Sequence, residues 1–116
     1  MLNPGVAVVA LALVAGPVAY AAEPPPVAVT LTLKAHRFSP DTVTAPAGAR
    51  IIVTLINQDL VGEEFDSDDL RVEEEVTPKA RIVFRLGPLK PGTYRFMGEG
   101  HPQTAQGRLI VVAPAS

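Results

Sequence analysis

The 116-residue chain contains no cysteine and no tryptophan. Without cysteine, no disulfide can stabilise the fold, and no thiolate can act as a nucleophile or as a soft metal ligand. Stability must therefore come from the burial of apolar side chains, which is feasible but modest for a domain of this size.

An excess of positive charge is also lacking, because the formal net charge is −2. Nucleic-acid binding depends on a basic surface, so we expect no nucleic-acid partner. The acidic residues are unevenly placed: nine of the twelve lie between Asp59 and Glu75, where Arg71 is the only basic residue. The remainder of the chain after residue 21 is basic overall, and this asymmetry needs a physical explanation.

Catalytic motifs are missing as well. The sequence has no Gly-x-Ser-x-Gly, no phosphate-binding glycine loop and no His-Glu-x-x-His. Each of these motifs places a nucleophile, a phosphate or a metal where a reaction needs it. We therefore expect a binding protein and not an enzyme.

Residues 6–18 form an uncharged, mainly apolar run that has the length of a signal-peptide core and is short for a membrane span. Small residues at Ala19 and Ala21 suit a signal peptidase, so we predict a signal peptide over residues 1–21 and a periplasmic or secreted protein. No Lys or Arg precedes the run. An uncleaved N-terminal anchor therefore stays open as the alternative, and in both cases the folded part lies outside the cytoplasm.

After a proline-rich leader at residues 22–26, the pattern over residues 27–116 is that of β-strands. Apolar and polar residues alternate over 27–34 and 80–86, which is typical of half-buried strands. Further strands are predicted at 42–45, 50–57, 70–76, 93–97 and 108–112, and residues 59–69 are predicted to be a loop with room for one helical turn at 67–70. Seven or eight strands separated by Gly/Pro turns predict an all-β, antiparallel Greek-key two-sheet sandwich.

Several motifs along this pattern resemble the cupredoxin family. They are Phe38-x-Pro40, Pro46-x-Gly48, the apolar strand that ends at Asn57, Pro91-Gly92-Thr93-Tyr94-x-Phe96 with His101 seven residues after the tyrosine, and Gly107-x-Leu109-x-Val111. The resemblance covers essentially the whole chain after residue 21 and implies a cupredoxin-like fold.

The chain departs from a blue-copper cupredoxin at three of the four ligand positions. The resemblance places Glu63-Glu64-Phe65 at the first histidine, Gly98 at the cysteine, and Ala105 and Gln106 near the axial methionine, so that only His101 is retained. A type 1 blue-copper site depends on a copper–thiolate bond. We therefore expect no such site. A role as an accessory electron-transfer protein, with a metal held in a cysteine-free site, is accordingly the weakest hypothesis for this chain.

A narrower resemblance is to the cupredoxin-like domains encoded with periplasmic iron-uptake systems. It is carried by Glu64-Phe65-Asp66-Ser67, Gly87-Pro88-Leu89-Lys90-Pro91-Gly92, Phe96-Met97-Gly98-Glu99-x-His101 and His36-Arg37-Phe38-Ser39-Pro40. This resemblance implies that copper or iron is bound through carboxylates and histidine. It also implies a delivery partner such as an inner-membrane iron permease or a periplasmic uptake protein.

Together with this resemblance, the spacing of the residues predicts a metal site whose ligands are His36, Glu64, Asp66, Glu99 and His101, with Glu73 in reserve. His101 lies in a polar loop and follows Glu99 by two residues, so in an extended loop both side chains can face one centre. Glu64 and Asp66 flank Phe65, so in extended chain both carboxylates point the same way. His36 follows the first strand, whose exit is expected at the same end of the sandwich. The alternatives are a histidine that bonds its own loop and solvated acids.

A ligand set of imidazole and carboxylate suits Cu(II), Fe(III) or Mn(II) better than Cu(I). The first hypothesis is therefore a periplasmic metal-binding protein that captures copper or iron or delivers it to an uptake system. The alternative is a metal-free interaction module that docks its acidic Asp59–Glu75 segment on a basic partner.

Overall fold

The structure is a computed structural model that describes residue 5, residue 16 and residues 23–114. The predicted signal peptide and its cleavage site therefore lie outside the described residues, apart from two isolated glycines. Within the described part of the chain, no helix is long and apolar enough to cross a membrane.

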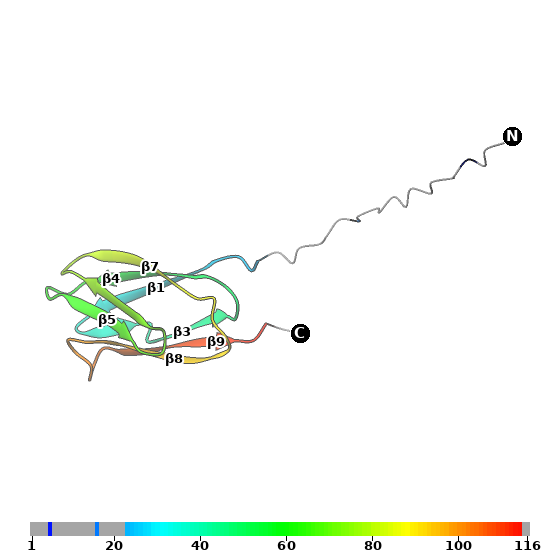
Figure 1. The fold of residues 1–116 in the computed structure, drawn as a ribbon. Coiled ribbons are helices and arrows are strands. Elements are labelled where there is room, and N and C mark those ends of the chain that lie inside the picture. The colour runs from blue at the N-terminus through cyan, green and yellow to red at the C-terminus, as the bar shows by residue number, and fades with distance from the viewer. Residues whose placement is uncertain (1–4, 6–15, 17–22, 115–116) are drawn as a thin grey trace.

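Nine strands pack as two layers (Figure 1). The first sheet has the order β2-β1-β4-β7 and the second has the order β3-β9-β8-β5-β6. The strands are β1 (Val27–Lys34), β2 (Arg37–Ser39), β3 (Thr42–Pro46), β4 (Ile51–Asn57), β5 (Glu63–Ser67), β6 (Val72–Val76), β7 (Arg81–Leu86), β8 (Gly92–Gly98) and β9 (Gln106–Val112). The predicted all-β two-sheet sandwich is confirmed.

The sheets are mixed and not purely antiparallel as predicted. β1 runs parallel to β4, and β3 runs parallel to β9, whereas the other pairs are antiparallel. The reason lies in the path of the chain, which leaves the first sheet after β2, adds β3 to the second sheet and returns as β4 beside β1. Such a crossover brings the chain back in its original direction, which a hairpin cannot do.

The predicted loop over 59–69 is wrong in its second half, because residues 63–67 form strand β5. Its inward positions are Glu63, Phe65 and Ser67, so the strand alternates in burial but not in hydrophobicity. The predicted helical turn at 67–70 is a turn over residues 68–71, fixed by a 3.0 Å hydrogen bond from the Leu70 N–H to Ser67 Oγ.

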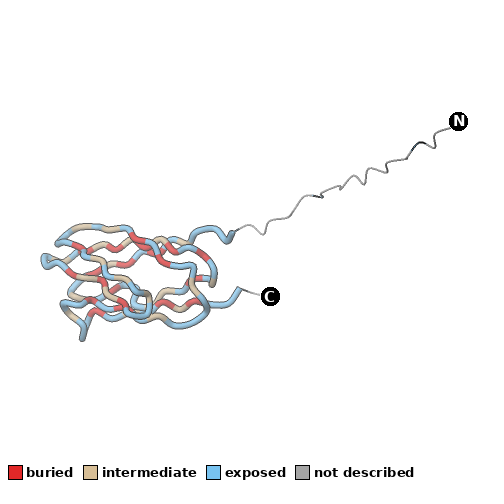
Figure 2. Tube along the Cα trace, in the orientation of Figure 1, coloured by how far each residue is buried: buried red, intermediate tan, exposed pale blue. Residues whose placement is uncertain are grey.

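The core lies between the two sheets, and its buried residues are the red stretches along the strands in Figure 2. All four phenylalanines of the chain meet there: Phe65 and Phe96 stack at a centroid distance of 4.9 Å, Phe38 meets Phe96 edge-on at 5.1 Å, and Phe84 lies 5.0 Å from Phe65. Such aromatic pairs add about 0.5–1.5 kcal/mol beyond their area burial. Phe65 thereby anchors β5 to both layers.

Replacing this central ring should destabilise the fold strongly. We expect Phe65→Ala to lower the free energy of unfolding by about 3–5 kcal/mol, because it leaves a cavity at a side chain that is 1% exposed. Val83→Ala, at a residue 60% exposed, is the matched control and should change it by less than about 0.5 kcal/mol. Urea unfolding followed by circular dichroism measures both, and equal losses would contradict the role given to Phe65.

Candidate metal centre

Three connections meet at one end of the sandwich and carry the polar residues. They are the β1–β2 turn, the β4–β5 connection and the β8–β9 connection. In Figure 1 this end of the sandwich lies opposite the C-terminus. The rings of His36 and His101 stack there at a centroid distance of 3.6 Å and an angle of 12°. The prediction that both histidines lie at the same end of the fold is therefore confirmed, and we refer to them as the histidine pair.

The position of His36 is set by Asp59. The Asp59 carboxylate accepts hydrogen bonds from the N–H groups of Ala35 (2.7 Å) and His36 (2.9 Å). Both donors have positive φ angles, of 50° and 57°, which non-glycine residues adopt only where the surroundings hold them. The bond from the His36 N–H is the main reason that the pKa of Asp59 is lowered. Asp59 Oδ2 also lies 3.6 Å from His36 Nδ1.

Asp59 is held in turn by the last residue of β4. Asn57 is 1% exposed, and its Oδ1 accepts the Asp59 N–H at 3.0 Å. Its side-chain amide donates to the carbonyl oxygens of Val61 (2.8 Å) and Thr77 (3.2 Å). A buried amide with all these partners fixes the loop rigidly, because leaving any of them unpaired would cost free energy.

His101 contacts a buried carboxylate that the sequence prediction did not include. Its Nδ1 lies 2.7 Å from Glu63 Oε2, and the Glu63 side chain is only 4% exposed. Glu63 Oε1 accepts the N–H groups of Gly100 (2.8 Å) and Glu64 (3.0 Å). Burial raises the pKa of Glu63, but the hydrogen bonds from His101, Gly100 and Glu64 outweigh burial and lower it overall. Glu63 is thus a satisfied, ionised group inside the fold.

The Glu63 carboxylate fills the space where the family resemblance places a cysteine. A Cβ atom on Gly98 would lie 2.7 Å from Glu63 Cδ and 2.8 Å from Ala105 Cβ. The family resemblance places Glu63 at the position of the first histidine, and Ala105 and Gln106 near that of the axial methionine. The only available signal for Glu63 was this position in the motif, because its burial is invisible in the sequence.

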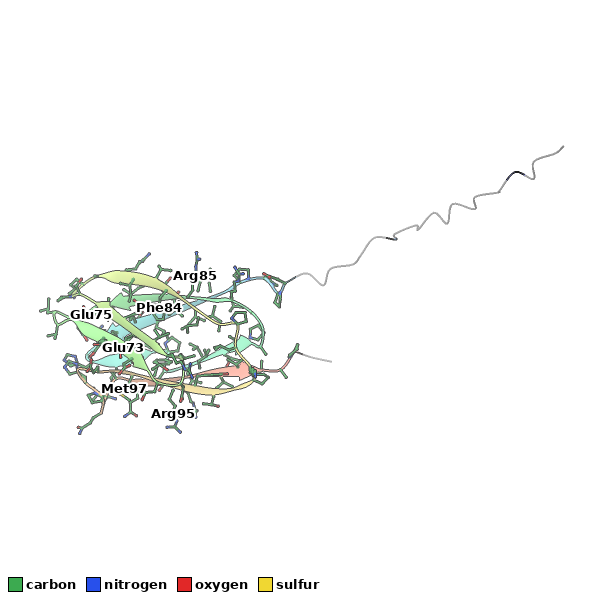
Figure 3. All side chains as sticks on the ribbon, in the orientation of Figure 1. Glu73, Glu75, Phe84, Arg85, Arg95 and Met97 are labelled. Carbon is green, nitrogen blue, oxygen red and sulfur yellow. The ribbon has the colours of Figure 1, made fainter. Side chains whose placement is uncertain are left out.

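The acidic side chains that were predicted as ligands lie on the outer face of the second sheet. Glu64 and Asp66 alternate with the buried Phe65 and point outward, as expected. Glu73 on β6 is directly opposite Asp66, and one carboxylate oxygen from each of Glu64, Asp66 and Glu73 lies within 4.8 Å of the others. Figure 3 labels Glu73 on β6. Glu73, which was predicted only as a reserve ligand, therefore belongs to this group.

Glu99 joins these acids and does not face the same centre as His101. Its side chain hydrogen-bonds Glu64, and this bond is the main cause that raises the pKa of Glu64 to about 7. Partial burial and the nearby charges of Glu99, Glu73 and Asp66 act in the same direction. We call Glu64, Asp66, Glu73 and Glu99 the carboxylate cluster.

The five predicted ligands thus divide into two groups, the histidine pair and three members of the carboxylate cluster. The division follows from β5, because consecutive residues of a strand point to opposite faces. Glu63 turns inward to His101, and Glu64 turns outward to Glu99. Met97, which pairs with Asp66 across β5 and β8 and is 41% exposed, places a thioether on the outer face beside the cluster (Figure 3).

Comparison with known proteins agrees with this architecture. A family model described as a cupredoxin-like domain matches residues 5–111. The chain belongs to this cupredoxin-like family. Uncharacterized protein RP394 of Rickettsia prowazekii (strain Madrid E) is 43% identical over 83 residues, which are 72% of this chain and 66% of that protein, so the chain spans just under two thirds of its length.

Two solved structures share the fold at low sequence identity. The metal-binding domain of the Cu(I)-exporting ATPase CopA of Streptococcus pneumoniae D39, solved with Cu(I), has a TM-score of 0.67 at 15% identity over 75% of this chain and 86% of that one. Auracyanin A, a blue copper protein of Chloroflexus aurantiacus, has a TM-score of 0.65 at 15% identity over 75% of this chain and 99% of that one.

The close contact at Gly98 predicts that even a methyl group is not tolerated there. We expect Gly98→Ala to lower the free energy of unfolding by about 1–3 kcal/mol, because the new Cβ would overlap the Glu63 carboxylate and Ala105. Gly62→Ala is the control, since its nearest neighbour would be an atom at 3.5 Å. Thermal unfolding of both variants tests this, and a neutral Gly98→Ala would show that Glu63 does not fill the space.

The raised pKa of Glu64 predicts how stability depends on pH. The folded state holds more protons than the unfolded state between the ordinary value of 4.5 and about 7, so the stability of the metal-free protein should fall as pH rises through this window. Glu64→Gln supplies an N–H donor at every pH and should flatten the profile. The lowered pKa of Glu63 acts separately, with stability lost as pH falls below its ordinary value of 4.5, and should persist in the variant.

Urea unfolding between pH 4 and 8, after treatment with a chelating resin, measures this profile. An unchanged slope above pH 4.5 in Glu64→Gln would contradict the assignment of the proton to Glu64.

Proposed function

We propose that this cupredoxin-like protein binds a metal ion outside the cytoplasm, in the periplasm, and captures copper or iron or hands it on to an uptake system. The observation that carries the proposal is the carboxylate cluster, in which oxygens of Glu64, Asp66 and Glu73 lie within 4.8 Å of one another. Carboxylates this close repel each other unless a proton or a cation lies between them. Oxygen ligands in such a set suit Cu(II) and Fe(III).

The pKa of Glu64 supports the same conclusion. A carboxyl group whose pKa is raised to about 7 retains a proton over much of the neutral range, and a bound cation would displace it. Binding should therefore release protons and should weaken as pH falls below about 7.

The histidine pair is proposed as a second ligand group. The Nδ1 atoms of His101 and His36 lie 2.7 Å and 3.6 Å from Glu63 and Asp59, respectively. At His101 the short contact is the usual arrangement that orients a histidine ligand and leaves its other nitrogen for the metal. His36 is instead positioned through the bonds of Asp59 to the backbone N–H groups of Ala35 and His36. Since imidazole suits copper, this group would favour Cu(II) over harder ions.

The identity of the cargo rests on two different supports. The similar solved proteins are a Cu(I)-bound domain and a blue copper protein, which supports copper. Iron, and a receiving inner-membrane permease or periplasmic uptake protein, rest only on the motif resemblance of residues 36–40, 64–67, 87–92 and 96–101. Binding and transfer without catalysis is the activity that we propose.

Metal titration of the purified chain tests the proposal. With Cu(II), or with Fe(III) supplied as a weak chelate, a metal concentration 100-fold above Kd should stabilise the fold by about 2.7 kcal/mol and raise Tm. Asp66→Asn and Glu73→Gln should each weaken binding at least about tenfold, because each removes a charged ligand. Glu74→Gln is the matched control, because Glu74 lies on the same strand but faces the other side.

Calorimetry and thermal shift read out the affinity, and the chelate alone serves as the blank. A copper adduct should also lack the intense blue thiolate band, because the chain has no cysteine. No heat and no thermal shift with either metal would contradict the proposal. In that case, salt-sensitive and chelator-insensitive capture of a basic protein would favour the metal-free interaction module.

A further inference from the structure

A second feature of the outer face has no part in the metal proposal. An open groove of about 420 Å³ crosses strands β3, β9 and β8. Its lining includes the polar side chains of Asp41, Thr42, Arg95, Gln106 and Arg108, together with Met97. A volume of this size lies within the range of small-molecule sites in proteins.

Two arginines dominate the charge of the groove. Arg95 on β8 and Arg108 on β9 are directly opposite each other in the antiparallel ladder, and both side chains are exposed on the same face. Like charges in directly opposite positions destabilise a sheet. Among residues 23–114, no carboxylate oxygen lies within 4.0 Å of either guanidinium, since the ion pairs found there involve His36, Arg50 and His101.

The two arginines are held to different extents. The Arg108 side chain is fixed partway along its length, because its Nε donates to Thr42 Oγ1 at 3.2 Å, and its backbone N–H donates to the Asp41 carbonyl oxygen at 2.8 Å. Arg95 is held through its backbone only, since its N–H donates to Asp69 Oδ2 at 2.8 Å. Among residues 23–114, no hydrogen bond occupies the terminal guanidinium nitrogens of either arginine, and Figure 3 shows Arg95 pointing away from the sandwich.

We propose that this groove binds a small oxyanion with at least two negative charges, either a polycarboxylate or phosphate, between Arg95 and Arg108. A guanidinium matches a carboxylate or a phosphate with two parallel hydrogen bonds, which a point charge such as lysine cannot do. Two arginines so close together offer two such forks, and an anion removes their mutual repulsion. Asp41 is the opposing charge in the groove and reduces the affinity.

The groove adjoins the carboxylate cluster on the same sheet. Met97 lines the groove and is also the cross-strand partner of Asp66. An oxyanion in the groove would therefore lie one strand away from a cation on the cluster. The inference itself does not depend on the metal, because the arginines and their repulsion are present in the metal-free protein.

Anion titration of the metal-free chain tests the proposal. Metal is removed with a chelating resin, because dissolved chelators are themselves polycarboxylates. Citrate, inorganic phosphate and, as the monovalent comparison, acetate are titrated at constant ionic strength by calorimetry and by amide NMR. We expect saturable binding of citrate or phosphate, with shifts at Arg95, Met97 and Gln106, and little binding of acetate. The ratio of the citrate and phosphate affinities identifies which of the two oxyanions the groove prefers.

Variants distinguish binding in this groove from nonspecific attraction of anions to any exposed arginine. Arg95→Gln and Arg108→Gln should each weaken binding about 10- to 100-fold and should raise Tm, because they remove the repulsion. Arg85→Gln, on β7 of the other sheet and exposed, is the matched control and should leave the affinity unchanged. Asp41→Asn should strengthen binding.

Three results would overturn the inference. The first is that neither citrate nor phosphate saturates the chain at about 10 mM, which is tenfold above a Kd of about 1 mM. The second is an equal affinity for acetate. The third is an Arg95→Gln Arg108→Gln double variant that binds like the parent chain. Each of these is independent of whether the metal titration succeeds, so the two proposals fail separately.

Discussion

The contact between Glu63 and His101 determines the arrangement of the candidate site. A carboxylate buried to 4% exposure is costly unless every oxygen is paired, and here His101 and two backbone N–H groups pair it. This contact fills the space where the family resemblance places a cysteine, and it lies beside the stacked rings of His101 and His36. The interior of the site is therefore electrostatically complete without an ion.

On the outer face of β5, by contrast, the carboxylates have no partner of opposite charge among the described residues. Glu64 and Asp66 meet Glu73 and Glu99 with no basic partner among the ion pairs of the described residues, and the resulting repulsion appears in the raised pKa of Glu64. One strand thus separates a satisfied carboxylate from an unsatisfied cluster. For this reason the candidate metal centre is placed on the outer carboxylates, and the histidine pair is a secondary ligand group.

The sequence predicted those features whose signal is local. Strands β1 and β7 were predicted because apolar residues alternate along them, and Glu64 and Asp66 were placed on one face by the same reasoning. β5 was missed because two of its three inward residues, Glu63 and Ser67, are polar. Their partners, His101 and the Arg95 carbonyl, are 38 and 28 residues away in the chain. Long-range pairing of this kind leaves no periodic trace.

Long-range hydrogen bonding also explains why the Glu99 and His101 side chains do not face one centre, contrary to the prediction from the sequence. The Glu99 N–H bonds the Glu64 carbonyl oxygen at 2.9 Å and so continues the sheet, whereas the His101 N–H turns back to Gly98 at 3.0 Å. The chain therefore changes direction between two residues that a simple extended loop would align. Parallel pairing of β1 with β4 was likewise unpredictable from strand patterns, because it depends on which sheet β3 joins.

The central claim is that an ion binds to the outer carboxylates of β5 and β6. Anomalous diffraction from crystals soaked in Cu(II), collected at the copper edge, locates the ion directly. The account predicts a peak bounded by Glu64, Asp66 and Glu73. No peak there, or a peak only at Glu63 and His101, would contradict it.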